Sequence, residues 1–214
     1  MSNGGLQVGR VLRAGTRGFA IGCAVMQPDG STERSPERSR RRLAEVIPAF
    51  GSFVRAEGQT PGSAIYGLIY DVSVEDDPFV RQFISANPPE EVVRDQRENR
   101  QIPIEVSVLA VGFADSETIR HRLPAQPPVT LDWLYQCTGE EVRAFTACFD
   151  YFRLVLEARE APADELLAAS LRTAAAARPE EERESFLVEA GRELARLLAS
   201  DPVRLEGLLR RLRA

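Results

Sequence analysis

The sequence contains no lysine, although it is rich in charge. All 27 basic residues among the 214 are arginine. A lysine Schiff base, a lysine general base and a Walker lysine all require an ammonium side chain, so the chain has none of them. The patterns GxGxxG and GxxxxGK are absent as well. The sequence therefore predicts neither of the usual glycine-rich nucleotide sites.

Histidine and cysteine are also scarce. His121 is the only histidine, which excludes a cluster of histidine metal ligands and leaves one residue for any Ser-His-Asp or Cys-His pair. It stands between two arginines, which disfavour imidazolium where the guanidinium groups lie close to the ring; the simpler interpretation is an exposed charged turn. The cysteines, Cys23, Cys137 and Cys148, are odd in number and form no CxxC pair. We expect them to be small apolar residues rather than a disulfide framework or a zinc site.

No long apolar run and no strongly basic region is present. No stretch approaches the roughly 20 apolar residues of a membrane span, and the first residues lack a signal-peptide pattern, so we expect a cytoplasmic protein. The net charge of −5 is shared between the two halves, because 15 arginines face 17 acids before Gly139 and 12 face 15 from there on. Neither half is a basic nucleic-acid domain. Hydrophobic residues make up 43%, enough for a real core.

The first half of the chain predicts a small β-barrel. Residues 6–25 alternate apolar and small residues on both sides of a turn at 14–17, which is typical of a hairpin. Two further strands are predicted over 50–56 and 64–74, joined by a loop with glycine and proline. The run 102–113 is β-branched and largely alternating, so we expect a strand that closes the barrel.

Other segments predict helix or extended chain. Helical excursions are expected at about 35–47 and 78–100, where a proline follows a serine or an aspartate at the start. The prolines of 121–137 predict an extended segment that wraps the surface and brings Trp133 and Tyr135 to a junction with the second half.

The capping box Thr138-Gly-Glu-Glu141 marks a change, and everything after it is predicted to be helical. We therefore predict an α+β fold with two domains, a barrel over 1–137 and an α-helical domain over 138–214.

Two groups of residues are candidates for contacts with a ligand or partner. Arg34, Arg38, Arg40, Arg41 and Arg42 form the densest basic cluster, which could neutralise phosphates or meet an acidic partner. The interleaved glutamates favour a solvated helix with internal ion pairs instead. Carboxylates at 75–77, with Asp71 upstream, resemble a cation site but lack the glycine turn of a calcium loop, so an acidic loop is the alternative.

Cys137 is the best candidate nucleophile. It precedes the predicted helix at 138, where the positive end of the helix dipole favours thiolate. No partner base is evident, and a packed cysteine is the favoured interpretation of this residue. We assign no residue to catalysis, to a cofactor or to a metal.

The two glycine-bearing strand segments Phe50-Gly-Ser-Phe-Val54 and Ile65-Tyr-Gly-Leu-Ile-Tyr-Asp-Val72, preceded by Val8-Gly-Arg-Val11, resemble the HAS-barrel. This small β-barrel is shared by HerA-type DNA-translocating ATPases and the catalytic subunits of ATP synthase. The resemblance covers about the first 115 residues, with an excursion at 27–47. The whole chain is also similar to bacterial proteins that carry a HAS-barrel without an ATPase domain.

The resemblance implies assembly or interaction rather than catalysis, because in the ATPases a separate domain binds the nucleotide. It offers no catalytic residues to transfer. Our leading hypothesis is a non-enzymatic interaction module, an accessory to a HerA-type ring ATPase in DNA processing, which contacts its partner or a second copy through the barrel edge or the terminal helix. The alternatives are a nucleic-acid-binding module that uses Arg34–Arg42 and a thiol-dependent small-molecule enzyme at Cys137.

Overall fold

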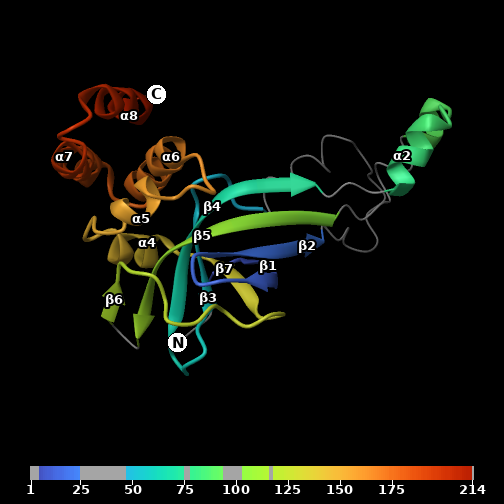
Figure 1. The fold of residues 1–214 in the computed structure, drawn as a ribbon, viewed down its shortest axis with the longest axis horizontal. Coiled ribbons are helices and arrows are strands. Elements are labelled where there is room, and N and C mark those ends of the chain that lie inside the picture. Colours follow the sequence, from blue (N-terminus) through green and yellow to red (C-terminus); the bar gives the residue numbers. More distant parts are fainter. Residues whose placement is uncertain (1–4, 25–46, 75–77, 94–102, 116–117, 214) are drawn as a thin grey trace.

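Six antiparallel strands form a closed barrel in the N-terminal half (Figure 1). The structure is a computed structural model that describes residues 5–24, 47–74, 78–93, 103–115 and 118–213. Around the barrel the strand order is β1-β7-β3-β4-β5-β2, and β2 pairs back with β1. The strands are β1 (Gln7–Ala14), β2 (Gly18–Ala24), β3 (Phe53–Glu57), β4 (Ala64–Val74), β5 (Pro103–Asp115) and β7 (Trp133–Gln136). The short β6 (Thr118–Arg120) pairs with β5 outside the barrel.

Most of the predicted strands are confirmed. The hairpin of β1 and β2 turns at 15–17, where the Gly15 amide donates to the carbonyl of Gly18 at 2.8 Å. The strand predicted over 102–113 is β5, and its pairing with both β2 and β4 closes the barrel as expected. A closed sheet has no long unpaired edge, which removes the usual route to strand-mediated aggregation.

The expectation that residues 121–137 wrap the surface is wrong for the last residues of this segment. Residues Trp133–Gln136 do not wrap the surface but form β7, inserted between β1 and β3. Leu134 of this strand is fully buried in the barrel. A strand of four residues is too short to show a clear period, and its hydrogen bonds go to segments roughly a hundred residues away in the sequence, so local pattern does not reveal it.

The central parts of strands β3, β4 and β5 are buried on both faces. One face contributes to the barrel interior, which side chains such as Val54, Ile69 and Val106 fill. The other face carries Phe53 and Leu68 to the helices. A strand covered on both sides needs apolar residues at nearly every position, which explains the almost continuous apolar run of β5.

The C-terminal half is helical, as predicted, and packs on the outer face of these strands (Figure 1). Its helices are α4 (Gly139–Phe145), α5 (Phe152–Leu156), α6 (Ala163–Ala176), α7 (Glu180–Leu197) and α8 (Pro202–Arg213). The predicted capping box is present, because the Thr138 hydroxyl accepts from the amide of Glu141 and the Glu141 carboxylate accepts from the amide of Thr138. Apolar residues of the barrel strands and of the helices form one continuous core, so the core crosses the boundary at residue 138.

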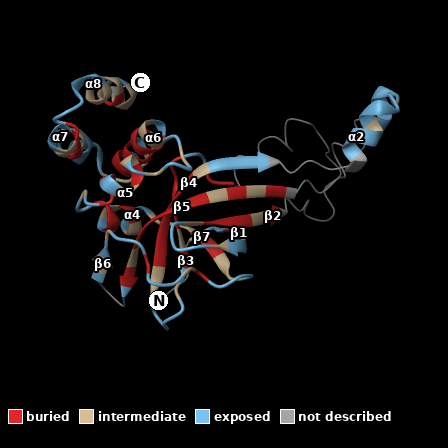
Figure 2. Cartoon of the chain, in the orientation of Figure 1, coloured by how far each residue is buried: buried red, intermediate tan, exposed pale blue. Residues whose placement is uncertain are grey.

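Helix α2 (Pro78–Ser85) lies beyond the end of β4 and β5, away from the barrel and the other helices (Figure 1). Its described residues are mostly exposed, as Figure 2 shows in pale blue. The helix start predicted at Pro78 is confirmed, and residues 90–93 are helical as well. Of the helical excursion expected at about 35–47, all but residue 47 lies outside the described residues. None of the described helices is long and apolar enough to cross a membrane.

Candidate functional site

The structure does not describe two of the predicted site groups. The arginines at 34–42, including Arg38, Arg40, Arg41 and Arg42, lie outside the described residues, and so do the acids at 75–77. Asp71 is described and lies exposed near the outer end of β4. In the parts of the chain that the structure describes, no three His, Cys, Asp or Glu side chains gather into a possible metal cluster.

Cys137 is a packed residue between β7 and α4. It is half-buried, and its side chain contacts the core shared by barrel and helices. Burial raises the pKa of the thiol well above its usual value, and the Glu141 carboxylate raises it further. The thiolate that the helix dipole was expected to favour is thus disfavoured, because desolvation of the charged form dominates.

His121 is half-buried and not an exposed turn residue. Its ring packs 4.6 Å from the ring of Phe145 and 5.5 Å from that of Tyr151, measured between centroids. Nε2 lies 2.9 Å from the carbonyl oxygen of Phe145, and since a carbonyl only accepts, Nε2 carries the hydrogen. The pKa of His121 is lowered, chiefly by burial, while that hydrogen bond and Asp150 act in the opposite direction. Burial, rather than the charge of the neighbouring arginines, is therefore the main cause of the shift.

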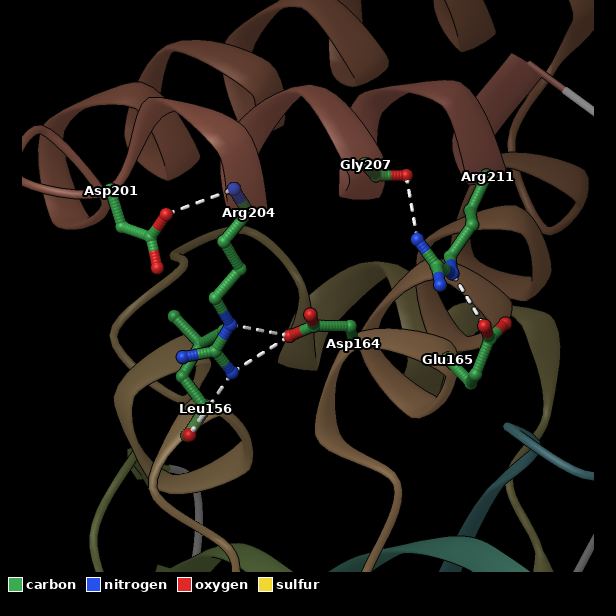
Figure 3. Close-up of polar contacts among 7 residues, drawn as sticks. All are labelled: Leu156, Asp164, Glu165, Asp201, Arg204, Gly207 and Arg211. Atoms are coloured by element: carbon green, nitrogen blue, oxygen red, sulfur yellow. Dashed lines mark hydrogen bonds and ion pairs between the residues drawn. The ribbon is translucent and has the colours of Figure 1, made fainter.

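The terminal helix α8 docks on its own chain. Leu208 is fully buried against the other helices. In Figure 3, Arg204 of α8 reaches Asp164 at the start of α6, with Nε 2.8 Å from Oδ1, and Arg211 pairs with Glu165. The Asp201 carboxylate accepts from the backbone amide of Arg204 at 3.0 Å, which caps the first turn of α8. These contacts use the inner face of α8 inside the molecule.

A groove of about 310 Å³ lies on the outer wall of the barrel, between the β1–β2 turn and the loop that joins α5 to α6. Its polar lining residues come from four segments far apart in the sequence: Arg13 and Arg17 of the first hairpin, Tyr70, Ser107 and Glu160. Sequence reasoning singled out none of them. No local signal could have done so, because each segment contributes only one or two of these side chains and only closure of the barrel and docking of the helices bring them together.

Large apolar side chains are also exposed outside the groove, among them those of α2 and of Leu131. On α2, Val80 and Ile84 expose 37% and 68% of their surface. On the barrel, Leu131 is 64% exposed and has a φ of 74°, a left-handed conformation that costs a β-carbon-bearing residue about 1 kcal/mol. Its amide donates to the Val11 carbonyl at 2.8 Å, and its carbonyl accepts from Arg10 Nη1 at 2.7 Å. These hydrogen bonds hold Leu131 in this conformation while its side chain stays exposed to water.

Neither a protein-family model nor a curated protein matches the chain.

Proposed function

We propose that the protein is a non-enzymatic interaction module that binds a ring ATPase of the HerA type in DNA processing. The observation that carries the proposal is α2, a helix that lies apart from the body of the molecule (Figure 1) and exposes the large apolar residues Val80 and Ile84. Such side chains gain free energy when a partner buries them. The choice of partner rests on the sequence resemblance to the HAS-barrel.

The geometry of α2 suits docking into an apolar groove. Val80 and Ile84 are four residues apart, so they share one face of the helix. Anchors at this spacing are those by which amphipathic helices are recognised. Burial of one such side chain contributes about 1.5–3 kcal/mol. Loss of Ile84 alone is therefore enough to weaken the complex measurably.

The barrel also supports an interaction role. Its interior is filled by aliphatic and aromatic side chains, among them Phe19, Ile21 and Leu134, each at most 5% exposed. A packed barrel works through its outer surface, as small barrels with filled interiors do. The two candidate catalytic side chains, Cys137 and His121, serve packing, and burial moves both pKa values away from the charged form.

The test is recovery of partners by the tagged full chain from a lysate of its own source at moderate salt, with identification by mass spectrometry. We expect a ring ATPase at stoichiometric level with the unaltered chain and its loss with Ile84→Glu. Val203→Glu is the matched control, because Val203 is an 80% exposed apolar residue on another helix. Circular dichroism checks that both variants fold.

Two results would contradict the proposal. One is recovery of the bait without any ring ATPase, and the other is equal recovery of the ATPase by Ile84→Glu and Val203→Glu. The first result would show that the partner is not a ring ATPase, and the second that α2 is not the contact surface.

A further inference from the structure

We propose that the groove on the outer wall of the barrel binds a small molecule that carries one oxyanion, either a carboxylate or a phosphate monoester. The groove measures about 310 Å³, which lies at the lower end of small-ligand sites. Its walls are the β1–β2 turn on one side and Glu160, in the α5–α6 loop, on the other. The groove does not include α2, so this inference goes beyond the interaction role and does not depend on it.

The charges at the groove favour an anion over a cation. Arg13 pairs with Glu105 through two hydrogen bonds, of 2.7 and 2.5 Å, and Arg17 pairs with Glu160 at 3.5 Å. In each pair the arginine is the exposed partner, with 68% against 13% side-chain exposure in the first and 63% against 33% in the second. An incoming ligand therefore meets guanidinium groups first, and guanidinium binds carboxylate and phosphate in a fixed planar geometry.

The pair between Arg17 and Glu160 is weak enough to be replaced. Its separation of 3.5 Å is at the outer limit of a hydrogen bond, and both partners are in contact with water. The same oxygen of Glu160 also accepts from the backbone amide of Arg159 at 3.0 Å. Exposed pairs of this kind contribute little to stability. The carboxylate of Glu160 thus pairs with Arg17 at the position where we place the oxyanion of the ligand.

The floor of the groove offers hydroxyl groups for the rest of the ligand. Val106 and Val108 point into the barrel, so Ser107 between them faces outward. Tyr70 stands at a bulge where β4 loses register with β5. Among the described residues, neither the Tyr70 nor the Ser107 hydroxyl has a hydrogen-bond partner. Gly18 allows the hairpin to pass close to β5 at the floor of the groove, since a Cβ at this position would lie 2.4 Å from the carbonyl oxygen of Val108.

The test is isothermal titration calorimetry of the full chain at low ionic strength with two probes, phenyl phosphate and benzoate. The better probe identifies which oxyanion the groove accepts. We expect saturable binding, and a loss of affinity of about tenfold or more with Arg17→Ala, because a charge-assisted hydrogen bond to the oxyanion is removed. With Glu160→Gln we expect the affinity for the probe to rise by up to about fivefold, because the carboxylate that competes with the ligand loses its charge.

Arg210→Ala is the matched control. Arg210 is an exposed arginine that pairs with Glu206 on α8, outside the groove, so its removal changes net charge equally without changing the site. Three results would overturn the proposal: no saturable binding of either probe, equal losses with Arg17→Ala and Arg210→Ala, or weaker binding with Glu160→Gln. Ile84→Glu should leave probe binding unchanged, so this test and that of the ATPase contact succeed or fail separately.

Discussion

Phe145 at the end of α4 joins the barrel to the helices, and its removal tests whether they unfold together. The residue is 1% exposed. Its ring centroid lies 5.7 Å from that of Phe53 in β3 and 5.0 Å from that of Tyr66 in β4, and 5.4 Å from that of Tyr151 beside α5. Aromatic contacts to both parts of the molecule therefore meet on one side chain.

Phe145→Ala should lower the free energy of unfolding by about 3–5 kcal/mol, the usual range for truncation of a buried phenylalanine. For a chain of this size each kcal/mol shifts the midpoint of thermal unfolding by about 2–4 °C, so the expected shift is on the order of 10 °C. Val188→Ala is the control, because Val188 is 47% exposed on α7 and should change stability by no more than about 0.5 kcal/mol.

Two probes distinguish the parts in urea unfolding. Trp133, the one tryptophan of the chain, reports on the barrel from β7, and far-ultraviolet circular dichroism reports mainly on the helices. We expect both transitions to coincide in the unaltered chain and to shift together in Phe145→Ala, because the core at Phe145 is shared. The reasoning is refuted if the helical signal moves to lower urea while the Trp133 midpoint stays in place. In that case 1–137 and 138–214 are independent domains.

Two further predictions concern the cysteines and the basic cluster. In the folded chain a thiol reagent should modify the exposed Cys148 quickly, as read by peptide mass spectrometry. Cys23 and Cys137 should react only on unfolding, because burial raises the pKa of Cys23 to about 11 and that of Cys137 well above its usual value. Fast modification of Cys137 would revive the thiol-enzyme alternative. The nucleic-acid alternative predicts salt-dependent DNA binding whose logarithmic salt slope falls by about 3 when Arg40, Arg41 and Arg42 become alanine. No binding by the unaltered chain at low salt removes that alternative.

The candidate site was far less predictable than the fold. Arg17 is an ordinary turn residue and Glu160 an ordinary loop acid, and they are 143 positions apart. Their meeting depends on which face of the barrel the helices cover, and no local period encodes that choice. For Cys137 the sequence predicted the position correctly, just before the start of a helix, but not the direction of the pKa shift, which burial decides.

The sequence by itself determined the elements whose causes are local. The alternation in 6–25 and 102–113 fixed strands, and the Thr138 capping box fixed the start of α4, because side-chain period and cap chemistry act over a few residues. Only the tertiary structure decided the role of β7, the double burial of β5 and the surroundings of His121. Each depends on contacts with residues far away in the sequence, where burial and desolvation outweigh what the neighbours along the chain would predict.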